Sequence, residues 1–385
     1  MNATKIYSLI LLFFIMSDLI AQEKQIRSIQ WNVAGFFPST ANEEKPLGLS
    51  GVAAGTNNGV LIIAGGTNFP AKMPWEGGKK KYYDNIYVYA RNRNQKLELL
   101  KTYKLPNSLG YSAAVSTRYG LFVGGGEKEG GPVPNCFLIS WDAIKDTISL
   151  KNLPDLPLAV TNASAAIYNN KVYLAGGEMA NAVSDKLFVL DLQNIEANWK
   201  TLAAIPRQVS HAVLLAQLQG SDACLYLVGG RKKIAGNSST LYSSNFCYHI
   251  SENKWSVKQS IPYTLSAGTG VAYGKRYLLL LGGDKGETFH KTEELLVQIA
   301  NEGDSLRKDK LIQEKNQVQI THPGFTKEVL LYNTKTDQWR HFGTIPFEVP
   351  VTTTAVKWGP VIYITGGEIK AGVRTDKILA GNICN

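Results

Sequence analysis

The segment VYLAGG at residues 172–177 is an apolar run that ends in two glycines, and the same phrase recurs along the chain. The other copies are VLIIAGG (60–66), LFVGGG (121–126), LYLVGG (225–230), LLLLGG (278–283) and VIYITGG (361–367). The last glycines of successive copies lie 60, 51, 53, 53 and 84 residues apart. Short apolar runs bounded by glycine are typical of buried β-strands. Repetition on this scale predicts a repeat architecture.

Each copy lies in a unit of four strand-like segments. One segment precedes the copy, as in SAGTGVAY (266–273), and two follow it, as in NFCYHIS (245–251) and the segment around Trp255. A four-stranded unit with a period near 50 residues is typical of the kelch-type β-propeller, in which each repeat forms one blade. The sequence therefore predicts an all-β fold, with one six-bladed propeller domain over residues 22–385.

The last unit lacks a fourth strand. After the Gly-Gly pair that ends at Gly367, the only further strand-like segment is KILAGNIC (377–384). The missing strand is supplied at the other end of the chain by IRSIQWNVAG (26–35), which carries Trp31. We expect this N-terminal strand to complete the last blade and close the ring, because closure removes the open edges of a sheet.

The 84-residue spacing contains an insertion at about residues 284–325. This insertion is strongly polar, and Leu295, Leu296 and Ile299 recur with helical periodicity. A helical excursion from the rim of one blade is therefore predicted. A lid, a contact surface for a homodimer and an inert decoration are the three roles left open.

The first 21 residues have the pattern of a secretory signal peptide. Lys5 precedes the apolar core YSLILLFFIM (7–16), and LIA ends in a small residue before Gln22. The apolar run is too short to span a membrane comfortably. We therefore expect cleavage after Ala21, export to the periplasm and no membrane span.

The charge and the cysteines exclude some partners. The net charge of +10 favours an anionic partner, but the sequence has no RNA-binding signature, so nucleic acid is not expected. The four cysteines are far apart and form no CxxC motif, so neither a metal nor a cofactor is predicted. A bridge between Cys224 and Cys247 stays open, although buried free thiols are the favoured interpretation.

The residue after each Gly-Gly pair is predicted to face one mouth of the central channel. In an antiparallel four-stranded blade, the loop after the second strand and the loop between blades open on the same side. The predicted ring consists of Thr67, Glu127, Glu178, Arg231, Asp284 and Glu368. Repulsion among the carboxylates would raise the pKa of at least one of them and suit it to acid–base chemistry. Turn capping or pairing with lysines and arginines is the structural alternative.

Loops on the same face add polar and aromatic side chains. The inter-blade loops contribute Asn107, Tyr111 and Arg207, and the loop at residues 67–85 contributes Asn68, Trp75, Glu76, Lys79, Lys80 and Tyr82. Such a mouth suits an anionic sugar, because rings stack on aromatic side chains and a carboxylate binds arginine. For the run Lys79–Lys81, a solvated surface is an equally good interpretation.

Two phrases resemble a known family. The segments GGTNFPAKMPWEGGKKKYYDNIYVY (65–89) and GGEIKAGVRTDKIL (366–379) are similar to the bacterial N-acetylneuraminate epimerases, also called sialic acid mutarotases. The resemblance covers essentially the whole mature chain. The blade order looks circularly permuted, because the EGGKK segment comes first here and late in better-known members.

The resemblance implies an isomerase that interconverts the α and β anomers of sialic acid without a cofactor or metal. It places the catalytic acid/base at Glu368 and the carboxylate-binding arginine at Arg374. Substrate-binding roles are implied less strongly for Arg207, Tyr111, Glu76, Lys79, Lys80 and Tyr82, and we add Asn68 and Glu178 from the predicted mouth. The similar phrase GGEMANAVSDKLF (176–188) has no arginine at the corresponding point, so the fold itself does not require Arg374.

In this chemistry Glu368 would move the proton of the anomeric hydroxyl while Arg374 holds the carboxylate. The group that protonates the ring oxygen stays open among Glu178, Tyr111 and a lysine of the 79–81 run. The alternative functions are a non-catalytic exported sugar-binding propeller, an epimerase for another sugar, and a scaffold for a protein partner.

Overall fold

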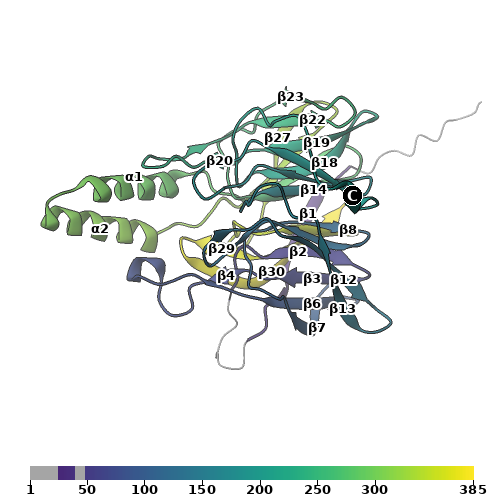
Figure 1. The fold of residues 1–385 in the computed structure, drawn as a ribbon, viewed down its shortest axis with the longest axis horizontal. Helices are drawn as coiled ribbons and strands as arrows, with labels where there is room; N and C mark the ends of the chain where they lie inside the picture. The colour runs from purple at the N-terminus through teal and green to yellow at the C-terminus, as the bar shows by residue number, and fades with distance from the viewer. Residues whose placement is uncertain (1–24, 40–47) are drawn as a thin grey trace, which may run out of the picture.

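A computed structural model describes residues 25–39 and 48–385. The predicted signal peptide lies outside these residues. The described chain forms six four-stranded antiparallel sheets around a common centre (Figure 1), which confirms the predicted all-β, six-bladed propeller.

The first five blades follow one another along the chain. From the innermost strand outward, they consist of β2 (Ala53–Asn57), β3 (Val60–Ala64), β6 (Asn85–Arg91) and β7 (Leu97–Lys104); β8 (Ala113–Thr117), β9 (Gly120–Gly124), β12 (Cys136–Asp142) and β13 (Thr147–Leu153); β14 (Ser164–Tyr168), β15 (Lys171–Ala175), β16 (Leu187–Asp191) and β17 (Lys200–Thr201); β18 (Val213–Gln219), β19 (Asp222–Val228), β22 (Asn245–His249) and β23 (Lys254–Lys258); and β24 (Thr269–Tyr273), β25 (Tyr277–Leu281), β26 (Glu328–Asn333) and β27 (Gln338–Thr344). Short strand pairs follow three of the Gly-Gly pairs: β4 (Thr67–Asn68) with β5 (Lys81–Tyr82), β10 (Glu127–Lys128) with β11 (Gly131–Pro132), and β20 (Arg231–Lys232) with β21 (Thr240–Leu241). Two 3₁₀ turns, η1 (Pro74–Glu76) and η2 (Ile195–Ala197), lie in the connections.

The sixth blade joins the two ends of the described chain. Its strands are β28 (Ala355–Trp358), β29 (Val361–Lys370), β30 (Val373–Cys384) and, outermost, β1 (Ser28–Phe36). Trp31 of β1 pairs with Gly381 of β30 in antiparallel register. The predicted closure by the N-terminal strand is therefore confirmed.

The Gly-Gly phrase is explained by backbone geometry. In each pair the first glycine has φ between 61° and 69° and the second between 90° and 124°, a region that other residues rarely adopt. A Cβ atom at Gly176 would lie 2.1 Å from the carbonyl oxygen of Val209 in the next inter-blade loop. Glycine is therefore needed both for the turn and for the close approach of the neighbouring blade.

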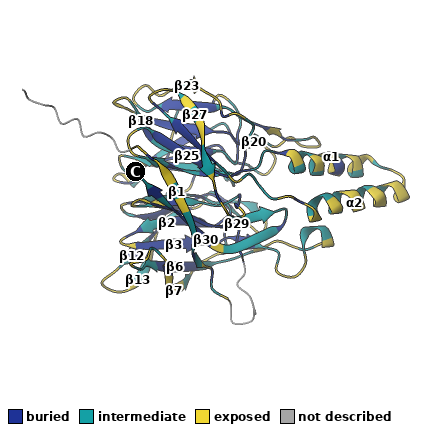
Figure 2. Ribbon diagram, turned by 180° about the vertical axis from the view of Figure 1, so that it is seen from behind, coloured by how far each residue is buried: buried dark blue, intermediate teal, exposed yellow. Residues whose placement is uncertain are grey.

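The hydrophobic core lies between neighbouring blades. All residues of β3, β9 and β25 are buried, and Figure 2 shows β3 in dark blue. Ile62 of the first blade, for example, belongs to the same buried cluster as Leu121 and Val123 of the second. Each such aliphatic side chain contributes about 1.5–3 kcal/mol on burial. The ring is therefore held together mainly by contacts between its blades.

The predicted insertion is a helical hairpin between β25 and β26. It consists of α1 (Glu287–Asn301) and α2 (Ser305–Ile320), which project from the end of the propeller where β4 and β20 lie (Figure 1). The Glu293 carboxylate of α1 accepts hydrogen bonds from the backbone N–H (2.8 Å) and hydroxyl (2.7 Å) of Ser239, and Leu295 is buried. Neither helix, in the described part of the chain, has the length and apolar character needed to cross a membrane.

Candidate active site

The six residues that follow the Gly-Gly pairs occupy equivalent positions, as expected. Each forms an antiparallel bridge with the residue that enters its own blade: Thr67 with Ser50, Glu127 with Gly110, Glu178 with Thr161, Arg231 with Ser210, Asp284 with Ser266 and Glu368 with Val351. Each blade thereby places one such side chain at one mouth of the channel. This ring of six is hereafter called the mouth ring.

A second ring, made of main chain, lies beside the mouth ring. One residue just before the innermost strand of each blade belongs to this ring: Gly51, Tyr111, Asn162, His211, Ala267 and Thr352. The backbone N–H of each donates to the carbonyl of the equivalent residue in the preceding blade at 2.7–3.0 Å. The six bonds form a closed hoop. All six residues have φ between 48° and 69°, which costs roughly 1–2 kcal/mol for each non-glycine residue. No motif in the sequence predicts this hoop, because the six side chains share no chemistry.

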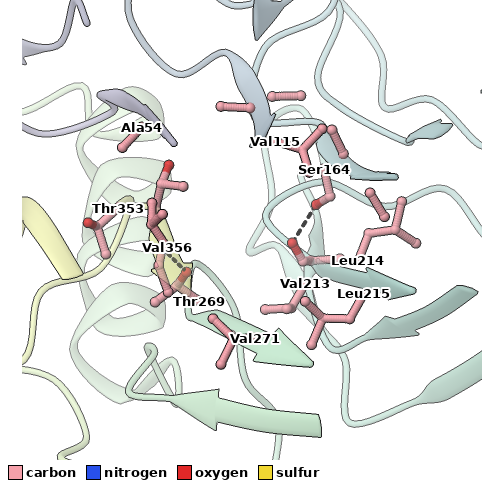
Figure 3. A pocket seen from close by; sticks show the side chains of 18 of the residues that line it. Ala54, Val115, Ser164, Val213, Leu214, Leu215, Thr269, Val271, Thr353 and Val356 are labelled. Atoms are coloured by element: carbon pink, nitrogen blue, oxygen red, sulfur yellow. Dashed lines mark hydrogen bonds between the residues drawn. The ribbon is translucent and has the colours of Figure 1, made fainter. Parts of the chain in front are cut away.

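The channel below the hoop is largely apolar. It encloses about 400 Å³ and is lined by the innermost strands of all six blades. Figure 3 shows Val115, Val271 and Val356 among the side chains that line it. The ionisable side chains of the lining are Tyr111, His211 and Lys357. Apart from these three, the lining consists of small polar side chains, aliphatic side chains and glycine.

Glu368 and Arg374 lie side by side in the mouth. They are direct partners in the β29–β30 hairpin, and Arg374 Nη2 lies 3.0 Å from Glu368 Oε2. Arg374 Nη1 donates to the carbonyl of Gly372 at 2.6 Å, and its guanidinium lies 4.5 Å from the ring centre of Phe69. The arginine side chain is only 3% exposed, whereas that of Glu368 is 22% exposed. The Glu368 carboxyl is therefore open to the mouth, whereas the Arg374 guanidinium is covered.

Burial raises the pKa of the Glu368 carboxyl above its usual range. Arg374, the backbone N–H of Gly372 and the ammonium of Lys80 act in the opposite direction, and the nearby Asp284 carboxylate adds to the increase. The net shift is upward, so Glu368 takes up a proton more readily than an ordinary carboxylate. A carboxyl with a raised pKa is better suited than an ordinary one both to accept and to donate a proton.

Asp284 occupies the mouth-ring position of the blade next to Glu368. Its Oδ1 atom accepts the backbone N–H of Gly286 at 2.8 Å, and burial raises its pKa. In the described part of the chain, Asp284 is the one acid of the mouth ring without an ion pair within 4 Å. The sequence placed Asp284 in the ring but not among the predicted site residues. Its position directly after a Gly-Gly pair was the available signal.

Glu127 is the centre of a small polar cluster. Its Oε1 atom accepts hydrogen bonds from Lys80 Nζ (2.9 Å) and Tyr82 Oη (2.8 Å), and Lys80 also lies 4.8 Å from the ring centre of Tyr111. Burial and the bond to Glu127 raise the pKa of Tyr82 to about 12. Tyr111 in turn hydrogen-bonds through its hydroxyl to that of Thr67 at 2.9 Å. The predicted residues Lys80, Tyr82 and Tyr111 are thus brought together.

Glu178 lies in a more firmly bound network. Its Oε1 atom accepts the Ser210 hydroxyl at 2.9 Å and lies 3.3 Å from His211 Nδ1 and 3.8 Å from Arg231 Nε. Burial alone would raise the pKa of Glu178, but His211, Arg231 and Ser210 outweigh it and hold the pKa well below its usual range. His211 is kept neutral, because burial and Arg231 lower its pKa. Glu178 is therefore a fixed anion.

Comparison with known proteins identifies the family. The N-acetylneuraminate epimerase family matches residues 153–385, more than half of the chain. The chain belongs to the N-acetylneuraminate epimerase family. It is 28% identical over 223 residues to the N-acetylneuraminate epimerase of Haemophilus influenzae strain 86-028NP, an alignment that covers 58% of this chain and 57% of the relative. The corresponding protein of Salmonella typhimurium strain LT2 is 28% identical over 249 residues, covering 63% and 61%.

The chain thus spans less than two thirds of the length of these relatives. The segment that matches the family, residues 153–385, contains five of the site residues discussed above: Glu178, Arg207, Asp284, Glu368 and Arg374. The loop at residues 67–85 and Tyr111 lie outside them. The circular permutation stays a prediction.

The remaining predicted site residues are Glu76, Asn68, Lys79 and Arg207, and three of them make contacts with nearby parts of the chain. Glu76 Oε2 accepts the backbone N–H of Met73 at 2.9 Å and caps the η1 turn, and the Asn68 side chain bonds to the backbone of Gly48 and Phe69. Lys79 is exposed. Arg207 lies over the rings of Tyr242 and Phe246, and forms no ion pair with a described residue. Their predicted roles in substrate binding remain predictions.

Proposed function

We propose that the protein is an N-acetylneuraminate epimerase that interconverts the α and β anomers of sialic acid by opening and closing the pyranose ring. The observation that carries this proposal is the Glu368–Arg374 pair: a carboxyl with a raised pKa opens into a charged mouth, in the segment that matches the family. The family and the names of the relatives support the substrate class.

The reaction moves two protons. The anomeric hydroxyl loses its proton, the bond between the anomeric carbon and the ring oxygen breaks, and the ring oxygen gains a proton. The anomeric carbon becomes a ketone and rotates, and the hydroxyl formed from the ring oxygen then attacks it from the other face while the two protons return. An ionised Glu368 accepts the first proton, and a protonated partner donates the second.

Asp284 is the described group best suited to be that partner. It neighbours Glu368 in the mouth ring, has no ion pair among the described residues, and has a raised pKa, so that it carries a proton more readily than a typical aspartic acid. Glu178 is unsuited to donate a proton, because its pKa is lowered. Lys80 and Tyr82 are already bonded to Glu127. Two neighbouring carboxyls that exchange roles fit a reaction that must run in both directions.

Arg374 is the proposed partner of the substrate carboxylate. Of its donors, Nη1 and Nη2 are engaged with Gly372 and Glu368, while the buried Nε has no hydrogen-bond partner. A carboxylate reaches this guanidinium when the Phe69 ring moves aside or when Glu368 releases it. In the second case binding would withdraw the charge that lowers the pKa of Glu368, so that substrate binding itself would prime the acid.

The overall positive charge supports collection of an anionic sugar at the mouth. The N-terminal pattern supports the further proposal that the protein is exported to the periplasm. The helical hairpin could contribute a dimer contact or a lid, and neither role is needed for the proposed chemistry.

The test is an anomer-exchange measurement. N-acetylneuraminate freshly released as one anomer is followed by NMR with and without the purified chain, and a catalytic excess rate is expected. Saturable binding of the sugar without any increase in exchange would select the binding-module alternative. Acceleration for another sugar acid or a neutral sugar, but not for N-acetylneuraminate, would show that the substrate is wrong.

A further inference from the structure

Two cysteines and a histidine meet in the fourth blade, at the end away from the mouth. Cys224 lies on β19, and Cys247 and His249 lie on the neighbouring β22. Both thiols are 0% exposed. One potential ligand atom from each of the three residues lies within 4.8 Å of the other two. The proposed anomerisation makes no use of this cluster.

The spacing of the polar atoms resembles the edges of a tetrahedron. Cys224 Sγ lies 3.7 Å from His249 Nδ1, and Gln219 Oε1 lies 3.9 Å from Cys224 Sγ and 3.7 Å from Cys247 Sγ. Ligand atoms that surround a tetrahedral zinc ion at its usual bond lengths are about 3.3–3.8 Å apart. Small movements would therefore bring these four atoms onto one ion.

The histidine is already held in the required orientation. His249 Nε2 lies 2.9 Å from the Ser256 hydroxyl, which itself donates to the carbonyl of Cys247 at 3.5 Å. With its proton used in that bond, the hydroxyl oxygen accepts from Nε2–H, so Nδ1 carries the lone pair that faces Cys224. Histidines that bind metals are typically fixed in this way by a partner on the other ring nitrogen.

The strand register argues against a disulfide as the purpose of the pair. Cys224 is opposite His249, and Cys247 is opposite Tyr226, so the cysteines are diagonal neighbours. Diagonal positions are about 7–8 Å apart, whereas the Cα atoms of a disulfide are usually about 4.4–6.8 Å apart. Both cysteines are free in the structure. A metal bridges two thiolates across a longer distance than a disulfide does.

We propose that Cys224, Cys247 and His249 form a site for Zn²⁺ or a similar divalent ion, with the Gln219 side-chain oxygen beside the fourth position. Binding releases the two thiol protons to solvent and joins the β18–β19 and β22 segments of the blade. The site is structural and independent of the mouth. The wide spacing of the cysteines in the sequence predicts no metal, but the register of β19 and β22 brings these distant residues together.

The experiment is a titration of the purified, reduced, metal-free chain with Co²⁺, followed by displacement with Zn²⁺. One equivalent of cobalt is expected to give the visible bands of a tetrahedral site and a thiolate-to-cobalt charge-transfer band, and zinc should remove both. Bound zinc should also raise the melting temperature. The absence of saturable binding would overturn the proposal, as would a Cys224–Cys247 disulfide in chain isolated without reductant.

Variants locate the ion. Cys247→Ser should lose the charge-transfer band, and His249→Gln, at a half-exposed position where folding is least affected, should lose the tetrahedral spectrum. Ser256→Ala should weaken binding about 10-fold through the freed imidazole. Cys384→Ser is the matched control, because Cys384 lies on β30 outside the cluster, and it should titrate like the parent chain. Equal losses in Cys384→Ser and Cys247→Ser would place the metal elsewhere and refute the site.

Discussion

The third and sixth blades carry nearly the same sequence after their Gly-Gly pairs, but the glutamates in these two segments have pKa values shifted in opposite directions. Glu178 and Glu368 both follow a Gly-Gly pair, and both bridge to the residue that enters their own blade. Glu368 meets an arginine of its own hairpin and has a raised pKa, whereas Glu178 meets His211 and Arg231 of the next blade and has a lowered one. Backbone position alone therefore does not decide what a carboxyl can do.

The difference lies in the number and origin of the partners. Glu178 Oε1 collects a hydroxyl, an imidazole and a guanidinium, and together these outweigh its burial. Glu368 has one charged partner in contact, and the neighbouring Asp284 carboxylate opposes it. A propeller can thus hold one carboxyl with a raised pKa and another with a lowered pKa at equivalent positions, by changing only the residues around each.

Replacement of Glu368 by glutamine should have the largest effect. The loss of the acid/base is expected to lower the rate of anomer exchange by about 10²–10⁴-fold, because glutamine cannot move a proton. NMR exchange under identical conditions gives the rate. Glu178→Gln is the comparison within the same ring and should lose much less activity. If Glu368→Gln keeps the full rate, the assigned role of this blade is wrong.

Asp284→Asn tests the proposed second acid. The variant should lose about 10²-fold in rate, since the ring oxygen then lacks its donor. The branch of the pH–rate profile that reports this acid should disappear as well. Asp309→Asn, on the exposed surface of α2, controls for the lost charge. An unchanged profile in Asp284→Asn would leave Glu368 to act with another group.

Arg374→Gln should move the pH dependence rather than only lower the rate. Arg374 lowers the pKa of Glu368, so its removal should raise that pKa further, and the ionised base should form only at higher pH. Each unit of displacement corresponds to a tenfold change in the ionised fraction below the pKa. Arg118→Gln, at an exposed position, should leave the profile in place. A profile that stays fixed in Arg374→Gln would contradict the electrostatic coupling.

Glu178→Gln should affect stability more than chemistry. Because the pKa of Glu178 is lower in the folded state, the unfolded state binds more protons in acid, and this stabilising contribution is complete above the ordinary value of 4.5 and lost as the pH falls below it. The variant should be destabilised by about 1–3 kcal/mol at pH 7. Urea unfolding should show that the gap to the parent narrows in acid. A gap that is independent of pH would mean that Glu178 acts by packing alone.

The smallest effect is expected at the main-chain hoop. Ala267 has φ of 54° and is part of the hoop, so Ala267→Gly removes strain of about 1–2 kcal/mol and adds about 0.5–1 kcal/mol of chain entropy. A net gain between zero and about 1.5 kcal/mol in unfolding free energy is expected. Ala272→Gly, in the regular strand β24 of the same blade, should lose stability instead. If both variants are destabilised alike, the hoop is not strained.

The fold could be predicted almost completely from the sequence, because the Gly-Gly phrase marks a turn that few other residues can adopt. The N-terminal closure followed from counting strands, and the helical insertion from the long spacing. The mouth ring could be predicted as well, since antiparallel blades place equivalent turns on the same face. Glu368 and Arg374 are singled out by the resemblance of the segment at residues 366–379 to a known family, and the structure places them in contact.

The partners of the other acids could not be predicted. His211 reaches Glu178 from a different blade, and the hoop joins residues that have only their backbone conformation in common. Among the described residues, Asp284 differs from the other acids of the mouth ring because it has no ion pair within 4 Å. No sequence motif indicates this difference. The same holds for the Cys224 cluster, where the strand register determines which side chains meet. All of these contacts join residues that are far apart in the sequence, and no local sequence pattern predicts which of them meet in the fold.

The pairing of β1 with β30 has a consequence for how the molecule is made. Residues 28–36 leave the ribosome early, but their partners at 377–384 follow only after the other five blades have been synthesised. Until then β1 has no place in a sheet, and the inner strands of the first and fifth blades lack a neighbour on one side. We therefore expect the first five blades to form before the ring is closed and the sixth blade to close it last. The ion pair of Glu368 and Arg374 lies in that last blade, so it takes its place beside the other mouth-ring residues only when the ring is complete.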